Sequence, residues 1–189
     1  MIAPGEWYPS YCSVLRAAQS GDSDAIASLY RSAAPAVLGY LRGHGAAEPE
    51  DLTSEVFIGV MRGLPAFRGG EADFRSWLFT IAHRRLLDER RRSTRRREQL
   101  VEPEMLGALL PPVEGPEDQV VERLAANPAL KALAVLTEDQ RSVVLLRLLA
   151  DLPVARVAQI LGKQEGAIKT LHRRALAALA RTVEREAVC

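Results

Sequence analysis

The sequence is poor in cysteine and has no long apolar run. Its only two cysteines, Cys12 and Cys189, lie at opposite ends of the chain, so they predict neither a disulfide framework nor a CxxC metal site. No stretch approaches the roughly 20 apolar residues that a membrane helix needs. The N-terminus also lacks the basic-then-apolar pattern of a signal peptide. We therefore expect a reduced, cytoplasmic protein without membrane insertion.

Residues typical of catalytic sites are equally scarce. The three histidines, His44, His83 and His172, are widely spaced, and none forms an HxxxH or HExxH motif. His83 and His172 fall in basic segments, where we expect them to face solvent or phosphates. Asp51 and Glu55 lie one helical turn apart, but this acidic face is more typical of a surface than of an acid–base pair. The sequence thus predicts no enzyme, no cofactor and no metal site.

Ala, Leu and Val make up most of the apolar residues, which together form 48% of the 189-residue chain. This fraction is ordinary for a folded protein, and the length suits one large domain or two small ones. Because β-branched residues hardly ever alternate with polar ones, the pattern favours helices over strands.

The net charge of +1 hides a block pattern along the chain. Residues 1–81 carry nine acids and six bases. Residues 82–97 carry eight arginines and two acids, and residues 98–127 carry seven acids and one base. Residues 137–181 carry eight bases and four acids. Two basic zones therefore flank an acidic one.

The acidic block has the composition of a linker. It contains four of the eleven prolines, which remove backbone donors and disfavour helix. The sequence predicts a first domain over 1–97, a flexible linker over 98–127 with a possible short helix at 118–124, and a second domain over 128–189. Because a proline-rich, acidic linker supports few apolar contacts, we expect the two domains to move independently.

Apolar periodicity and capping residues predict the helices. Pro35 should kink or divide the second of them, Thr137 opens a capping box with Gln140, and Gly162 should stop a helix. The expected helices cover 12–20, 24–43, 49–63, about 73 through the arginines, a segment from 128, about 137–150, 153–161 and about 165–184.

Residues 153–181 match a helix-turn-helix, a unit that places its second helix in the major groove of DNA. The face presented to DNA would carry Lys169, Thr170, Arg173 and Arg174. A plain helical hairpin with a solvated basic face remains open from spacing alone. On the opposite face, we expect the apolar residues of the second helix to pack on the first: Ile168 and Leu179 on Val157, Ile160 and Leu161.

Residues 74–97 combine an apolar stripe with a dense run of arginines. Phe74, Trp77, Leu78 and Ile81 have helical spacing, and we expect Trp77 to pack in the core. Eight arginines in sixteen residues repel one another, but such a run is tolerable beside a polyanion, whose phosphates arginine binds bidentately. The segment therefore favours nucleic-acid contact over a merely solvated tail.

Two motif sets in this order resemble the extracytoplasmic-function (ECF) class of RNA polymerase sigma factors. PEDLTSEVF (49–57) and FRSWL (74–78) with Ile81-Ala82 resemble region 2. LTEDQRSVVLLR (136–147), VAQILG (157–162) and GAIKT (166–170) resemble region 4. The resemblance covers about 24–97 and 128–181. The chain departs from the common pattern with Arg84 in place of Asn and Ala167 in place of Thr.

The resemblance implies an all-α fold: two small helical domains, sigma region 2 and sigma region 4 with its helix-turn-helix, joined by the acidic Pro-rich linker. It implies that one helix docks on the β′ clamp of RNA polymerase core through Asp51, Leu52, Glu55, Val56, Ile58 and Arg62. It implies recognition and melting of the promoter −10 element through Arg68, Phe74, Arg75, Arg84, Asp88, Arg91 and Arg92. It implies −35 element binding through Lys163, Gln164, Gly166, Ala167, Lys169, Thr170, Arg173 and Arg174.

The implied partners are the RNA polymerase core (β′ clamp and β flap), promoter DNA and an anti-sigma factor that covers the polymerase-binding faces. Through the polymerase the protein would be associated with the nucleoid. Two other functions stay open: a stand-alone helix-turn-helix regulator and, less favoured, an enzyme such as a nuclease. Adding the purified chain to core polymerase and promoter fragments distinguishes them, because only a sigma factor yields promoter-specific transcripts.

Overall fold

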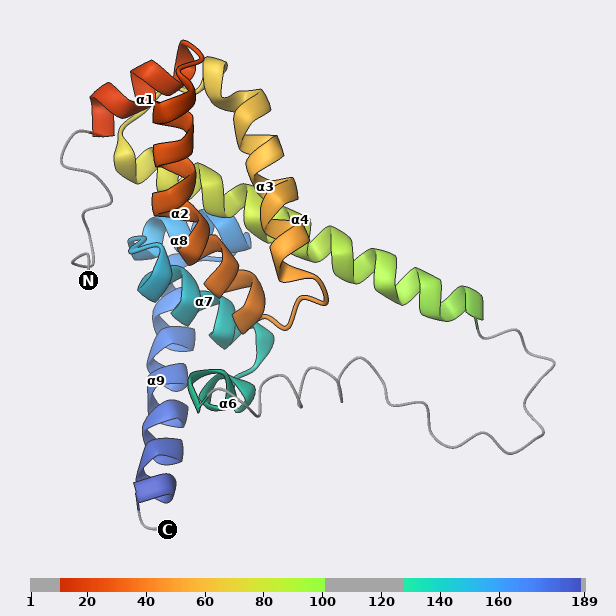
Figure 1. Cartoon of the computed structure of the whole chain (residues 1–189). Coiled ribbons are helices and arrows are strands. Elements are labelled where there is room, and N and C mark those ends of the chain that lie inside the picture. Colours follow the sequence, from red (N-terminus) through yellow and green to blue (C-terminus); the bar gives the residue numbers. More distant parts are fainter. Residues whose placement is uncertain (1–10, 101–127, 188–189) are drawn as a thin grey trace.

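The computed structural model describes residues 11–100 and 128–187, and the regular structure of this part of the chain is entirely helical (Figure 1). The predicted all-α class is confirmed. The first group of helices is α1 (Tyr11–Gln19), α2 (Ser23–Gly43), α3 (Pro49–Gly63), the 3-10 turn η1 (Leu64–Ala66) and α4 (Glu71–Leu100). The second is α6 (Pro128–Ala134), α7 (Glu138–Leu149), α8 (Val154–Leu161) and α9 (Glu165–Ala187). Most of the predicted linker, with its helix at 118–124, lies outside the described residues.

Local sequence accounts for most helix ends. The Asp22 side chain accepts a hydrogen bond of 2.8 Å from the Ala25 amide and caps α2. Thr137 and Gln140 form the predicted capping box of α7. Gly162 ends α8 in the left-handed region at φ 63°. Pro35 lies inside α2, and the helix is not divided at this position.

The first group builds its core around α2 and α4. The α1–α2 hairpin and α3 pack around them, and the largest fully buried side chains include Tyr40, Phe74 and Phe79. Beyond this core α4 continues out from the body of the molecule as an extended rod (Figure 1). Its first half is therefore part of the core, and its arginine-rich half is displayed.

In the second group, α7, α8 and α9 form the helix-turn-helix domain. Ile168 is fully buried in the main core, where Val157, Ile160 and Leu161 also lie, as predicted. The prediction for Leu179 was wrong: it packs in a separate small cluster with residues of α6, α7 and α9. Because α8 has only eight residues, the later turns of α9 extend past it and need another partner. That cluster contains Leu136, Val144 and Ala175, with Leu133, Ala178 and Leu179 at its edge.

The two groups are packed on each other, α7 against α2 and α8 against α4. One buried cluster contains residues from both. On α2, a Cβ atom at Gly39 would lie 3.3 Å from the Leu149 side chain, and one at Gly43 only 2.8 Å from that of Leu145. These two glycines let the backbone of α2 approach α7 closely. The sequence did not predict this contact, because a contact surface between distant segments leaves no local periodicity. That the domains move independently unless a partner clamps them stays a prediction.

Candidate nucleic-acid and polymerase interfaces

Helix α9 presents a cationic face opposite its buried face. Ile168 and Ala175 are fully buried, whereas Lys169, Arg173 and Arg174 are exposed. The Thr170 hydroxyl donates to the Gly166 carbonyl at 3.0 Å, one turn earlier in the helix. The arrangement suits a recognition helix, since three cations can reach phosphates or base edges without disturbing the core.

The start of α9 adds small and polar groups to this face. Gln164, Gly166 and Ala167 are exposed, so the backbone there can approach a ligand. Lys163 is half-buried, and its ammonium lies 3.0 Å from the Asp139 carboxylate of α7. Because this ion pair already neutralises the Lys163 ammonium in part, Lys163 is a weaker candidate for DNA contact than Lys169.

The start of α4 is less accessible than the sequence suggested. Phe74 is 1% exposed and Arg75 8% exposed. Phe74 lies among the rings of Tyr11, Phe67 and Trp77. Its assignment as a DNA contact is therefore corrected to a core role. Arg75 is held between Glu71, at 4.0 Å, and Asp151 of the second group, at 3.6 Å.

The loop before α4 is held by a residue that the sequence analysis did not single out. Gln19 Nε2 donates to the carbonyls of Leu64 and Phe67, at 3.0 and 2.8 Å. Trp77 stacks on Phe67 with ring centroids 5.0 Å apart, and a Cβ at Gly63 would come within 2.7 Å of the indole. Arg68 is exposed at the rim of this loop. The predicted packing role of Trp77 is confirmed.

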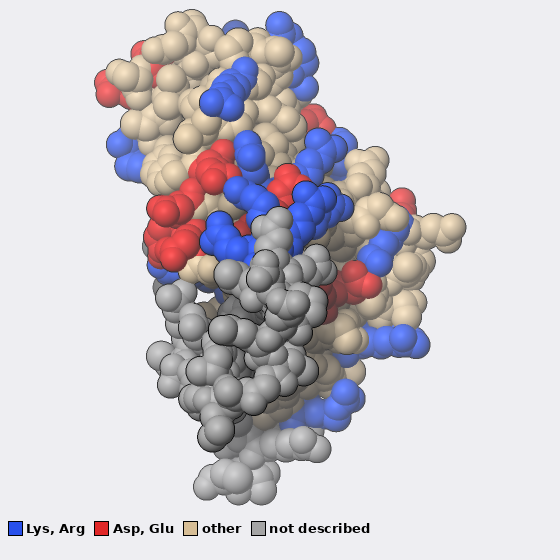
Figure 2. Space-filling model, turned by 90° about the vertical axis from the view of Figure 1, so that its right-hand side faces the viewer, with Lys and Arg blue, Asp and Glu red and all other residues tan. Residues whose placement is uncertain are grey.

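The displayed half of α4 carries a cationic surface with acids beside it (Figure 2). Arg84, Asp88, Arg91 and Arg92 are all exposed. Glu55 of α3 lies 3.9 Å from Arg92 and 3.7 Å from Arg85. These contacts are at the surface, so solvent and salt screen them. Arginines in such weak pairs can exchange a carboxylate for a phosphate.

Helix α3 divides its predicted polymerase-binding residues between surface and core. Asp51, Ile58 and Arg62 are exposed and Glu55 is half-exposed. Leu52 and Val56 are 4% and 0% exposed. Both are therefore corrected from contacts to core residues that support the helix, because they lie on its inner face.

An open groove of about 500 Å³ lies between the α1–α2 turn, α2 and α3. Its apolar lining includes Tyr30, Phe57 and Met61, and Tyr30 is 43% exposed. Ile58, at 50% exposure, follows Phe57 on α3. An exposed apolar surface beside acidic side chains is typical of a protein-binding site. Ile58 was predicted from the sequence as a contact residue, whereas Tyr30 and Met61 were not, because helical periodicity assigns both to a core face.

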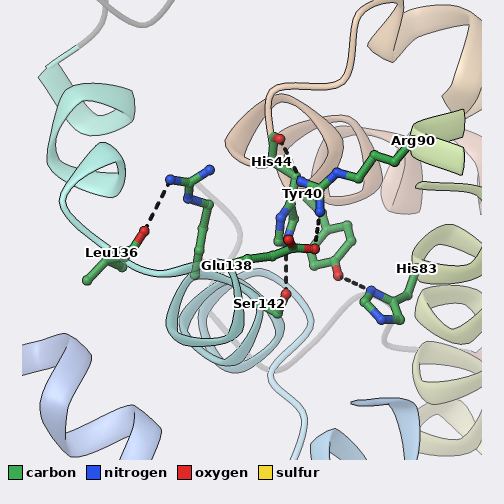
Figure 3. Close-up of polar contacts among 8 residues, drawn as sticks. Tyr40, His44, His83, Arg90, Leu136, Glu138 and Ser142 are labelled. Carbon is green, nitrogen blue, oxygen red and sulfur yellow. Dashed lines mark hydrogen bonds and ion pairs between the residues drawn. The ribbon is translucent and has the colours of Figure 1, made fainter. Parts of the chain in front are cut away.

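A polar cluster joins the two groups of helices (Figure 3). The Ser142 hydroxyl of α7 lies 3.3 Å from His44 Nε2, and Tyr40 and His83 are hydrogen bonded at 2.8 Å. Arg90 pairs with Glu138 and donates to the His44 carbonyl at 3.0 Å. The expectation that His83 faces solvent or phosphate was wrong.

Burial sets the ionisation of this cluster. It lowers the pKa of His44 well below the ordinary value, and the positive charges of Arg90 and Arg141 lower it further. Burial and Arg90 also lower the pKa of His83. Burial raises the pKa of Tyr40. These shifts favour the neutral forms of His44, His83 and Tyr40, and the charged groups around them are Arg90, Arg141 and Glu138.

The described residues contain no group of three His, Cys, Asp or Glu side chains placed to hold a metal ion. Within the same part of the chain, no helix has the length and apolar character needed to cross a bilayer.

Comparison with known proteins identifies both helical regions. Residues 29–96 match the model of sigma-70 region 2, and residues 127–179 match that of sigma-70 region 4. The ECF RNA polymerase sigma factor BldN of Streptomyces coelicolor is 42% identical over 90% of this chain, which spans 64% of the BldN length. The RNA polymerase sigma factor YlaC of Bacillus subtilis is 31% identical over 79% of this chain and 87% of its own.

A solved structure has the same fold. CnrH, in complex with the cytosolic domain of CnrY, superposes with a TM-score of 0.59 at 21% identity, over 93% of this chain and 97% of the CnrH chain. With both regions present in order, and relatives matched over most of their length, the chain belongs to the sigma-70 family as an ECF RNA polymerase sigma factor.

Proposed function

We propose that this protein binds RNA polymerase core and directs it to promoters by recognising their −10 and −35 elements. The observation that carries the proposal is the display of two cationic surfaces on different regions of one chain. One is the face of α9 with Lys169, Arg173 and Arg174, and the other is the exposed half of α4. Two such surfaces suit a factor that binds two separate DNA elements.

The proposed contacts follow exposure, except for Arg75, which is 8% exposed. Polymerase core would bind the outer face of α3, the −35 element would bind α9, and the −10 element would bind the loop at Arg68 and α4. The proposed domains remain 1–97 and 128–189, joined by 98–127. The contact residues are Asp51, Glu55, Ile58 and Arg62 for polymerase; Gln164, Gly166, Ala167, Lys169, Thr170, Arg173 and Arg174, with Lys163 as a weaker member, for −35; and Arg68, Arg75, Arg84, Asp88, Arg91 and Arg92 for −10.

We also propose an anti-sigma partner that covers the polymerase-binding face. Support comes from the apolar groove at Tyr30, Phe57 and Met61 next to exposed Ile58. The protein with the same fold, CnrH, was solved in complex with the cytosolic domain of CnrY. Polymerase would hold the factor at the nucleoid, in the cytoplasm.

The test is reconstitution of the full chain with bacterial core polymerase and a library of genomic promoter fragments. Promoter-specific transcripts that require the chain are expected. Tight, sequence-specific DNA binding without polymerase would instead support a stand-alone regulator, and DNA cleavage would support an enzyme.

A paired substitution assigns the polymerase surface. Ile58→Asp places a charge at a half-exposed apolar position and should weaken core binding at least tenfold while the fold survives. Arg16→Ala, at an exposed site on α1, is the matched control and should leave core binding unchanged. Equal core affinity of both variants would remove α3 from the interface.

A further inference from the structure

The loop that the proposed function places at the −10 element is held by a side chain of α1. Gln19 is the last residue of that helix. Its Nε2 donates to the carbonyls of Leu64 and Phe67, at 3.0 and 2.8 Å, across 45 and 48 positions of sequence. The match to sigma-70 region 2 begins at residue 29, so it assigns no role to α1 or to Gln19.

The two hydrogen bonds use the full donor capacity of the Gln19 amide. A glutamine amide nitrogen carries two N–H groups, and each of them meets one carbonyl. Leu64 begins the turn η1 and Phe67 directly follows it, so the amide binds both ends of the turn. The bonds therefore fix where the turn lies relative to α1.

Helix α1 is firmly anchored, so it can serve as a support for the loop. Tyr11 and Leu15 are each 6% exposed, and the Tyr11 ring centroid lies 5.9 Å from that of Phe74. The helix also packs along α2. Because its inner face belongs to the core, α1 holds Gln19 at a fixed position beside the loop.

The hydrogen bond to Phe67 also affects the exposed Arg68. Arg68 Nη1 donates to the Phe67 carbonyl at 2.7 Å and to the Pro65 carbonyl at 3.0 Å. A carbonyl oxygen has two lone pairs, and that of Phe67 accepts from Gln19 and Arg68 together. The orientation of the Arg68 guanidinium therefore depends on a carbonyl that Gln19 holds.

The second half of the loop is held by its own neighbours in sequence. The Gly70 amide donates to the Asp73 carboxylate at 3.1 Å, and the Phe74 amide donates to the Gly70 carbonyl at 3.0 Å. These bonds attach the second half to the start of α4. Removing the Gln19 amide should therefore loosen the first half of the loop, from Leu64 to Arg68, and leave α4 in place.

We propose that Gln19 is a positioning residue for −10 recognition, which holds the Leu64–Phe67 backbone and thereby Arg68 in the geometry that distinguishes −10 sequences. The inference rests on the proposed function for its effect on DNA and on the two hydrogen bonds for the loop. A loop already held in its binding conformation loses less conformational entropy when DNA binds. Without the amide, preferred and substituted −10 sequences should be bound more nearly alike.

Gln19→Met tests the proposal, because it keeps the length of the side chain and removes both donors. Discrimination is the ratio of open-complex formation by the holoenzyme on promoters with the preferred and with substituted −10 sequences. It should fall by about 2- to 10-fold for each lost hydrogen bond. Gln19→Glu should lower it further, since a carboxylate has no donor and repels the two carbonyls. Discrimination among −35 sequences should stay as in wild type.

Ala17→Gly is the matched control, two positions earlier on α1. Glycine weakens a helix by about as much as the loss of one hydrogen bond, and this substitution removes neither of the bonds to the loop. The variant should keep wild-type −10 discrimination. An equal loss of discrimination in Ala17→Gly and Gln19→Met would overturn the proposal, because the stability of α1 would then explain both.

Hydrogen exchange of the free full-length chain, followed by mass spectrometry, tests the loop without polymerase. Residues 64–70 should exchange about 2- to 10-fold faster per lost bond in Gln19→Met than in wild type. Unchanged exchange there would show that Gln19 does not hold the loop, and faster exchange with unchanged −10 discrimination would remove its positioning role. Absence of promoter-specific transcripts from wild type would instead reject the proposed function, and the exchange rates would still decide whether Gln19 holds the loop.

Discussion

At the scale of single residues, α9 has two faces with different physical tasks. Ile168 is fully buried, so it contributes to the free energy of unfolding. Lys169 and Arg173 are exposed, so they contribute to DNA binding. Substitutions on the buried face should therefore lower the free energy of unfolding, whereas substitutions on the exposed face should weaken DNA binding.

Ile168→Ala should lower the free energy of unfolding by about 2–5 kcal/mol, because the truncation leaves a cavity in a packed core. Urea denaturation followed by circular dichroism measures the decrease. Lys169→Ala, the adjacent exposed position, is the control and should stay within about 0.5 kcal/mol of wild type. Equal stability of the two variants would show that α9 does not bury the face that carries Ile168.

Arg173→Ala should leave the fold intact and weaken −35 binding in the holoenzyme. Removal of a bidentate base contact costs about 1–3 kcal/mol and relaxes selectivity at one position, whereas removal of a phosphate contact weakens all sequences alike. A panel of −35 variants separates these two roles. No change in either affinity or selectivity would mean that this face of α9 does not meet DNA.

At the scale of elements, α4 is one helix with two functions. Its first half packs in the core through Phe74, Leu78 and Phe79, which fixes the direction of its arginine-rich half. Two arginines there, Arg85 and Arg92, pair at the surface with Glu55, whereas Arg90 contributes to the polar cluster at His44. A rigid helix can therefore carry cations to DNA without those cations being part of the core.

Replacing Arg91 and Arg92 with Ala should weaken promoter complexes and reduce their dependence on salt. Removing one phosphate contact lowers the log–log salt slope by about 0.9 on duplex or about 0.7 on single strand. Titrating holoenzyme–promoter affinity against salt gives the slope. Arg16→Ala on α1 removes one charge elsewhere and should leave the slope unchanged. An unaltered slope in the α4 variant would place these arginines away from phosphate.

At the scale of the whole molecule, the contact between the regions carries two neutral histidines. His44 is faced by Arg90 and His83 from α4 and by Arg141 and Glu138 from α7. Burial in the folded protein lowers the pKa of both histidines below the ordinary 6.5, and the positive charge of Arg90 lowers it further, so the unfolded chain binds protons more readily than the folded protein does. The stability that the two neutral histidines contribute is therefore fully present above about pH 6.5 and is lost as the pH falls towards the lowered values.

Acid should destabilise the folded protein. Below pH 6.5 the free energy of unfolding should fall by up to about 1.4 kcal/mol per pH unit for each histidine, and urea denaturation followed by circular dichroism measures the decrease. The double variant His44→Gln and His83→Gln cannot titrate there and should lose this dependence. The same pH response in that variant would assign the effect to other groups.

Local structure and family membership could both be predicted from the residues alone. Apolar period, the Thr137 capping box and Gly162 defined the helices, because these signals act within a few residues along the chain. The cationic face of α9 was predicted for the same reason: a helix maps sequence spacing directly onto its faces. The ordered pair of region 2 and region 4 motifs then indicated the function.

How the helices meet became visible only in three dimensions. The fold buries Leu52, Val56, Phe74 and Arg75, which the family resemblance had placed at interfaces. It brings His44 to Ser142 across 98 positions of sequence. Such contacts depend on the shapes of two surfaces that are distant along the chain. The residue pattern of one surface does not indicate which other surface it will contact. Periodicity in the sequence therefore could not predict that the two regions pack on each other.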